Sequence, residues 1–117
     1  MMTQLTMELP DLLAQRVRSM DRWLPTILEI SLLGLRTEAT AVASELINFL
    51  SSGPSSEAVL DFHISDEAQA RTQRLLALNA SGLLGAKENA EMDELIEIER
   101  IVVTLKTQIA AELQRAQ

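Results

Sequence analysis

The sequence predicts a mainly α-helical protein. A short N-terminal strand, which could pair with the same strand of a second chain in a dimer, is followed by a five- to six-helix bundle that ends in a long helical hairpin. Three observations predict this fold. The 117 residues are 47% hydrophobic but only 3% aromatic, so the core must be aliphatic, and chains rich in Leu and Ala favour helices. Four Gly and three Pro leave few turns for a β-sandwich. Apolar residues also recur at spacings of three and four, as in amphipathic helices.

The N-terminal strand is predicted from the alternation of apolar and polar residues in TQLTMEL, residues 3–9. The apolar side holds Leu5, Met7 and Leu9, and the polar side holds Gln4, Thr6 and Glu8. A lone strand leaves its backbone N–H and C=O groups unpaired, and the sequence offers no obvious partner strand. We therefore expect a homodimer whose protein interface includes Leu5, Met7 and Leu9.

The first helix is expected to begin at Pro10 and Asp11, because Pro fixes φ and an acidic residue complements the helix dipole. Pro25 ends this helix and can begin the next. Further helices are predicted at residues 26–34, about 37–50, about 56–62, about 66–79 and about 86–115. Segment 26–34 is apolar on nearly every side, which predicts burial all round. Ser55 or Ser56 is expected to cap the short helix and Ser65 the one after it.

The last helix carries the longest apolar stripe of the sequence. Its members Leu95, Ile98, Val102, Leu105 and Ile109 alternate at spacings of three and four. We expect this stripe to pack against the 66–79 helix as an antiparallel hairpin. Three further residues widen the stripe beyond what one helix covers: Ile96, Ile101 and Val103. They are predicted to meet a protein partner or the second subunit; burial under residues 26–34 and 37–50 is the alternative.

The segment SSGPSS, residues 51–56, is the clearest break in the chain. It separates an N-terminal dimerisation region, residues 1–50, from a partner-binding helical hairpin, residues 57–117. No apolar stretch approaches the roughly 20 residues that span a bilayer, and no signal-peptide pattern is visible at the N-terminus. The chain also has no cysteine. We therefore expect a cytoplasmic protein without membrane contact.

No residue pattern points to catalysis, so we do not expect an enzyme or a bound cofactor. The single histidine, His63, has Asp61 and Asp66 nearby, but such spacing is more typical of a surface or capping residue than of a metal ligand. The acidic run ENAEMDELIEIE, residues 88–99, is interpreted as a solvated helix face. Trp23 is either an interface anchor or, as we favour, a residue that closes the core at a helix joint.

The net charge of −7 is unevenly distributed along the sequence. Residues 1–24 are neutral and contain Arg16, Arg18 and Arg22, whereas residues 25–64 sum to −4 and residues 65–117 to −3. Only the first segment has the clustered arginines that phosphate contacts require. The acidic remainder suits a protein partner with a basic surface.

LTMELPDLLAQRV, residues 5–17, resembles the opening of ribbon-helix-helix proteins, in which an alternating strand precedes L-P-[DE]-x-L and an amphipathic helix. The resemblance implies that two paired strands enter the major groove of DNA. The base-reading positions would then be Gln4, Thr6 and Glu8, and the phosphate contacts would come from Arg16, Arg18 or Arg22. Glu8 is an anion where the family typically carries a base, so motif and charge oppose each other over DNA binding.

Residues 74–113 resemble the tails of small bacterial proteins, several of which have antitoxin-like heads. The matching positions are Leu78, Asn79, Gly82, Leu84, Glu88, Glu91, Asp93, Leu95 and Glu99. Together the two resemblances imply the antitoxin of a toxin–antitoxin system, which neutralises a cognate toxin and regulates its own transcription through the N-terminal strand. The alternative is a helical adaptor or assembly protein that binds another protein and never contacts DNA.

Overall fold

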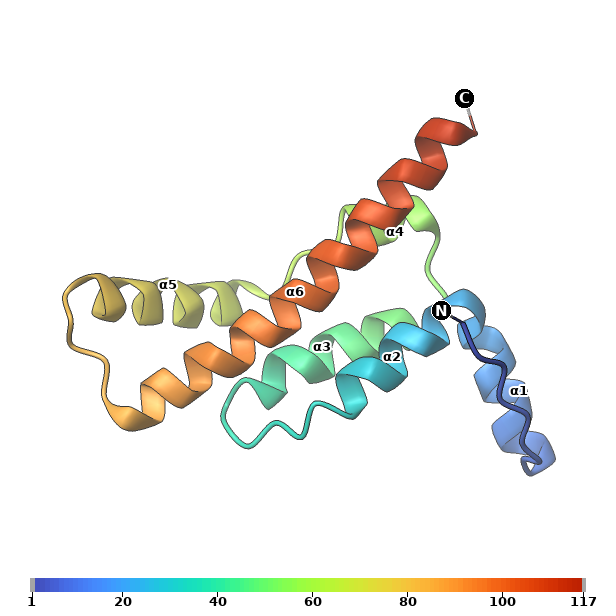
Figure 1. Cartoon of the computed structure of the whole chain (residues 1–117), viewed down its shortest axis with the longest axis horizontal. Coiled ribbons are helices and arrows are strands. Elements are labelled where there is room, and N and C mark those ends of the chain that lie inside the picture. The colour runs from blue at the N-terminus through green and yellow to red at the C-terminus, as the bar shows by residue number, and fades with distance from the viewer. Residues whose placement is uncertain (1, 117) are drawn as a thin grey trace.

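The computed structural model describes residues 2–116, apart from the side chain of Asp21. This part of the chain contains six α-helices and one short 3-10 helix. They are α1 (Asp11–Met20), the 3-10 helix (Asp21–Trp23), α2 (Leu24–Ser31), α3 (Thr40–Ser51), α4 (Ser56–Leu60), α5 (Asp66–Ala80) and α6 (Ala86–Arg115). Figure 1 shows α6 running through the molecule, with α2 and α3 beside its middle and α4 beside its C-terminal half. The mainly helical prediction is confirmed.

The core forms where α6 meets the shorter helices α2, α3 and α4. Its fully or almost fully buried members come from all four helices and include Ile30, Leu50, Val59 and Ile109. The stripe of α6 supplies Ile98, Ile101, Leu105 and Ile109 to this cluster. Burial of each large aliphatic side chain contributes about 1.5–3 kcal/mol. The core thus draws on residues from both sides of the 51–56 segment.

Helix boundaries follow the capping residues that the sequence predicts. The Ser55 hydroxyl accepts a hydrogen bond from the backbone N–H of Ala58, and the Ser65 hydroxyl accepts one from Ala68. Gly53 ends α3 with a φ of +71°, and a Cβ there would lie 2.6 Å from the carbonyl oxygen of Ser19. Only glycine fits this close approach between the end of α3 and the end of α1.

Trp23 closes the core at the joint between α1 and α2. Its side chain is buried, and its indole N–H donates a hydrogen bond of 2.8 Å to the carbonyl oxygen of Pro54. The Arg22 guanidinium lies over the indole ring, 4.6 Å from its centroid. The core interpretation of Trp23 is therefore confirmed, and the 51–56 segment is fastened to this joint.

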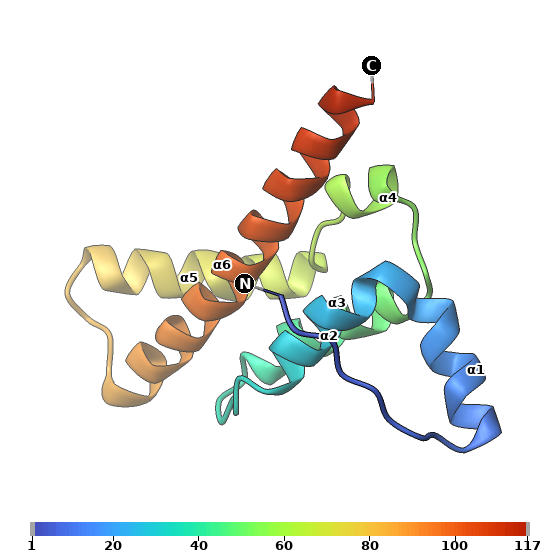
Figure 2. The same ribbon diagram turned by 45° about the vertical axis from the view of Figure 1, so that its right-hand side comes forward.

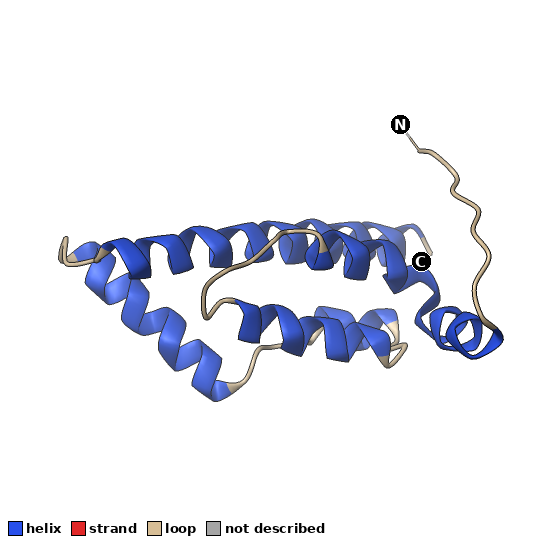
Figure 3. Cartoon of the chain, turned by 90° about the horizontal axis from the view of Figure 1, so that it is seen from below, coloured by secondary structure: helices blue, strands red, loops and turns tan. Residues whose placement is uncertain are grey.

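The predicted N-terminal strand is wrong. Residues 2–10 are an irregular extended segment, dark blue in Figure 2, and Figure 3 shows it leading away from the helices; residues 2–116 contain no strand. Leu5 and Met7 are exposed and Leu9 is half-buried. The alternating pattern has no second segment within the chain with which to form a ladder, and a backbone without a ladder is not a strand.

Two packing predictions also need correction. The stripe of α6 packs mainly on α2, α3 and α4, while α5 diverges from α6 instead of lying along it as a hairpin partner (Figures 1 and 3). The reason is composition, because α5 is largely polar and Leu75 is its one buried residue. Segment 26–34 is not buried all round either: Ile27 and Ile30 are buried, but Leu28 and Leu32 are exposed.

We expect Ile109→Ala to lower the free energy of unfolding by about 2–5 kcal/mol, because Ile109 is fully buried and truncation leaves a cavity. Urea denaturation followed by circular dichroism measures this loss. Val103→Ala on the same helix is the matched control, since Val103 is exposed and its truncation should cost less than about 0.5 kcal/mol. Equal losses in the two variants would contradict the assigned core.

Candidate protein-binding surfaces

The first candidate is an exposed face of α6, formed by Asp93, Ile96, Glu99 and Val103 and called the α6 face below. These positions are three or four residues apart, so they lie on one side of the helix. Ile96 is 55% exposed and Val103 is 54% exposed, while both acidic residues are exposed. Ile96 and Val103 form its apolar part and Asp93 and Glu99 carry its negative charge, while the exposed Arg100, between the two apolar positions, is paired with Glu97.

Ile101 does not belong to the α6 face. It is 5% exposed and packs in the core, so for this residue the alternative of burial within the chain holds. Of the three residues predicted to widen the apolar stripe of α6, only Ile96 and Val103 are exposed. Periodicity alone did not separate the three, because the position of the covering helices decides which side of a wide stripe is buried.

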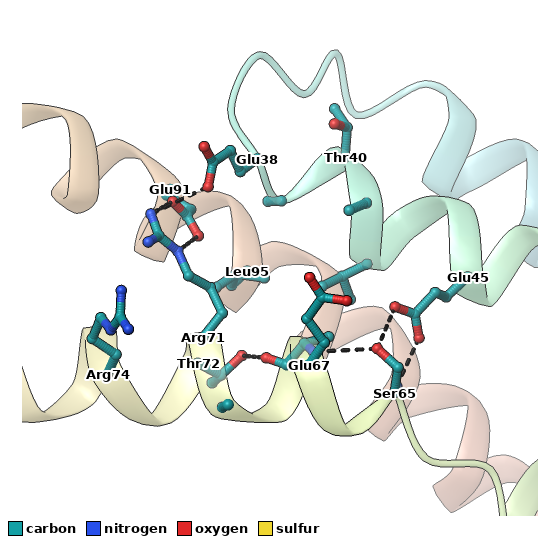
Figure 4. Close-up of a pocket in the computed structure, with 15 residues that line it drawn as sticks. Glu38, Thr40, Glu45, Ser65, Glu67, Arg71, Thr72, Arg74, Glu91 and Leu95 are labelled. Atoms are coloured by element: carbon teal, nitrogen blue, oxygen red, sulfur yellow. Dashed lines mark hydrogen bonds and ion pairs between the residues drawn. The ribbon is translucent and has the colours of Figure 1, made fainter.

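The second candidate is a groove between α3, α5 and α6, drawn in Figure 4. It consists of two adjoining hollows of about 650 Å³ and about 390 Å³, which share Val42, Thr72 and Leu95. Its apolar wall comes from α3 and α6 and includes Val42, Leu46, Leu95, Ile98 and Val102. Its charged residues are Glu38, Glu45, Glu67, Arg71, Arg74, Glu91 and Glu99. We call it the α3–α5–α6 groove.

An ion pair between the partly exposed Arg71 of α5 and the buried Glu91 of α6 joins these helices at one end of the groove. The Arg71 guanidinium donates two hydrogen bonds to the Glu91 carboxylate, of 3.0 and 2.7 Å, and lies 3.3 Å from the carboxylate of Glu38. The side chain of Glu91 is 3% exposed. The Arg71 hydrogen bonds lower the pKa of Glu91 below its usual range and outweigh burial, which raises it. Bidentate pairing therefore keeps this buried carboxylate ionised.

Two other glutamates fasten loops to helices. Glu94 on α6 accepts hydrogen bonds from the backbone N–H of Arg36 at 2.8 Å and of Thr37 at 3.0 Å, and from the Thr37 hydroxyl at 2.6 Å. Burial raises the pKa of Glu94, but these hydrogen bonds together bring it below its usual value. Glu45 on α3 accepts two hydrogen bonds from Ser65, from the backbone N–H and the hydroxyl. Glu94 thus holds the α2–α3 loop, and Glu45 holds the start of α5.

The acidic run of residues 88–99 is therefore only partly the solvated face that the sequence suggested. Glu91 is buried and Glu94 binds another loop, while Glu88 accepts a weaker bond from the Gly85 N–H at 3.3 Å. The structural role of Arg71 was missed. Arg71 is one of two arginines in α5 and lies twenty residues before Glu91, and no local spacing rule links Arg71 to Glu91.

The predicted DNA-contact residues divide into two groups. Gln4, Thr6, Arg16 and Arg18 are exposed. Arg22 is committed to the helical body, because its guanidinium donates to Glu112 at 2.7 Å and to the Ser56 hydroxyl at 3.2 Å. Without a strand, Gln4 and Thr6 have no ribbon that would direct them into a groove of DNA. Contact of the exposed arginines with DNA stays a prediction.

His63 is exposed on the loop between α4 and α5, at the edge of the α3–α5–α6 groove. Among the residues that the structure describes, no group of three or more histidine and carboxylate side chains is placed to hold a metal ion. The ion pair and hydrogen bonds of Glu91 position α5 against α6.

We expect Arg71→Met to lower the melting temperature clearly, because it leaves the Glu91 carboxylate buried without its partner. The melting temperature is read by circular dichroism at neutral pH. Arg100→Met is the matched control: its pair with Glu97 joins two exposed side chains of α6, and such pairs contribute little. If both variants melt alike, the Arg71–Glu91 pair does not hold α5.

The hydrogen bonds of Glu94 should make the free energy of unfolding decrease in acid. Its pKa is below the ordinary 4.5, so its contribution is complete above that pH and is lost as the pH falls through the folded-state pKa. At pH 7, Glu94→Gln should lower the free energy of unfolding by about 1–2 kcal/mol. As the pH falls through the folded-state pKa of Glu94, the wild-type carboxyl becomes protonated as well, and the two proteins should converge. A difference that stays constant over this range would contradict the prediction; urea denaturation at each pH measures it.

No family model, curated protein or solved structure matches this chain significantly. Within the described residues, no helix combines the length and apolar character needed to cross a membrane. The α6 face and the α3–α5–α6 groove each combine apolar residues with charged ones.

Proposed function

We propose that this chain is a non-catalytic binding protein of the antitoxin type, which masks a toxin protein with a basic surface by means of its α6 face. One observation carries the proposal: Ile96 and Val103 are each more than half exposed on the longest helix, between the carboxylates of Asp93 and Glu99. An apolar ridge with charged margins is the usual composition of a protein-binding surface, apolar at its centre and polar at its rim.

The charge of the chain supports a basic partner. The net charge is −7, and on the described part of α6 the acidic side chains at the margins of the α6 face point outward. Negative charge on one protein accelerates its encounter with a positive surface and disfavours acidic competitors. Toxins that bind or cleave RNA carry such positive surfaces, so an acidic helical partner is suited to cover them.

The adaptor alternative uses the same surface. An adaptor would bind its partner through the α6 face without changing the partner's activity, so binding alone does not distinguish the two functions. Autoregulation through an N-terminal strand is no part of the proposal, because residues 2–10 form no strand. The difference between antitoxin and adaptor lies in what happens to the partner's activity on binding.

The test is co-expression in bacteria with the protein encoded by the neighbouring gene. We expect that protein to stop growth alone and to be neutralised by this chain in a stable complex. The double substitution Ile96→Lys and Val103→Glu should abolish rescue, because it places charges on the apolar ridge while both side chains stay exposed. Colony counts measure rescue, and calorimetry with the purified pair should show at least a roughly tenfold weaker Kd for the variant.

Leu32→Lys is the matched control, since Leu32 is exposed directly after the end of α2 and lies outside the α6 face. It should rescue growth like the wild type. A complex that forms without any effect on toxicity would favour the adaptor. Rescue that survives the double substitution would show that the partner binds elsewhere, and circular dichroism of each variant checks that the helices are intact.

A further inference from the structure

α1 is the least covered helix of the chain. None of its ten residues, Asp11–Met20, is buried, and it projects to one side of the molecule (Figure 1). Leu12 is 78% exposed and Leu13 is 44% exposed. Only Met20, at the end that joins the 3-10 helix, packs against the core. Soluble proteins seldom leave a helix of this kind without a partner surface.

The exposed side of α1 combines apolar and basic residues. Arg16 lies four residues after Leu12 and three after Leu13, so the three side chains share one side of the helix. Arg18 is also exposed, and Asp11 at the first turn is the only acidic residue of α1. The chemistry that would cover this helix is therefore an apolar surface bordered by carboxylates.

The α3–α5–α6 groove has this complementary chemistry. Its wall is aliphatic, with Val42, Leu95 and Val102 only partly buried by their own chain. Five glutamates and two arginines line it, and Arg71 is already committed to two of the glutamates. Figure 4 shows Glu67 extending from α5 into the open space that faces α3. Glu67 lines the larger hollow and Glu99 the smaller one, and both carboxylates are exposed.

We infer that the α3–α5–α6 groove binds α1 of a second copy of this chain. In this contact Leu12 and Leu13 pack on Val42, Leu95 and Val102, and Arg16 pairs with Glu67 or Glu99 at the rim. The two surfaces match in both apolar character and charge, although neither has a partner within its own chain. This self-association goes beyond the proposed function, because it needs no partner protein and shares only Glu99 with the α6 face.

The geometry of the chain requires that α1 come from another copy. α1 is joined directly to Trp23, which is buried and hydrogen-bonded to Pro54, and its last turn is held against Gly53. A ten-residue helix is about 15 Å long, and α1 and α5 lie at opposite sides of the molecule (Figure 1). α1 therefore projects away from its own groove. A two-fold axis makes the exchange reciprocal, so that two grooves are filled in one dimer.

A disulfide trap tests this contact, because the natural chain has no cysteine. One preparation carries Leu13→Cys and the other carries Ala70→Cys, which lines the groove and is exposed. When the two are mixed and oxidised, a mixed disulfide can form only between chains. We expect it to form several-fold faster than with a Gln73→Cys preparation, since Gln73 is an exposed residue of the same helix that does not line the groove.

Light scattering gives a second, independent measurement on proteins without cysteine. The wild type should be a dimer, and Leu12→Asp with Leu13→Asp should weaken its association by about tenfold or more. Both leucines are at least partly exposed, so helicity should not change. Equal disulfide rates at residues 70 and 73, or a wild type that stays monomeric at the concentrations used for trapping, would overturn the inference. Either result leaves rescue through the α6 face unaffected, so the two proposals fail separately.

Discussion

The length of α6 is the constraint on which the rest of the structure depends. Its 30 residues extend over about 45 Å, and its apolar stripe must be covered along most of that distance. The longest helix that packs on the stripe, α3, has 12 residues, or about 18 Å. Coverage therefore comes from several short helices in succession: α2 and α3 at the middle and α4 towards the C-terminal end (Figure 1). Where no apolar helix is available, near the N-terminal end, α5 is held by the Arg71–Glu91 pair instead. The α3–α5–α6 groove lies between α3, which packs on α6 through apolar side chains, and α5, which is held to α6 by the ion pair.

The sequence predicts the helices well and their packing poorly, for a physical reason. Helix ends depend on nearby residues, so Ser55 and Ser65 mark the starts of α4 and α5 correctly. The N-terminal alternation and the wide stripe of α6 depend instead on what lies opposite in space. A period of two predicts a strand only if a neighbouring backbone is present. Likewise, Ile101 and Val103 are indistinguishable in sequence, yet the position of α2 and α3 buries the first and exposes the second.

The positions of the carboxylates could not be predicted from the sequence either. Net charge suggests that glutamates lie in solvent, but Glu45, Glu91 and Glu94 point inward and accept hydrogen bonds from other segments. The negative charge available to a partner is therefore smaller than the net charge of −7 implies. It remains at exposed carboxylates, Asp93 and Glu99 among them, so the location of the charge is more informative than its total.

Glu99 also connects the two proposed contacts. It belongs to the α6 face and at the same time lines the α3–α5–α6 groove, because the two surfaces are adjacent sides of one helix. An arginine that pairs with Glu99 from the groove side removes negative charge from the margin of the α6 face. Occupation of the groove by α1 therefore changes the electrostatic part of partner binding while leaving the Ile96–Val103 ridge uncovered. By thermodynamic linkage the partner must alter self-association by the same factor. A basic partner competes with Arg16 for the Glu99 carboxylate. The coupling between partner binding and self-association at Glu99 is therefore negative, because each contact neutralises a charge that attracts the other.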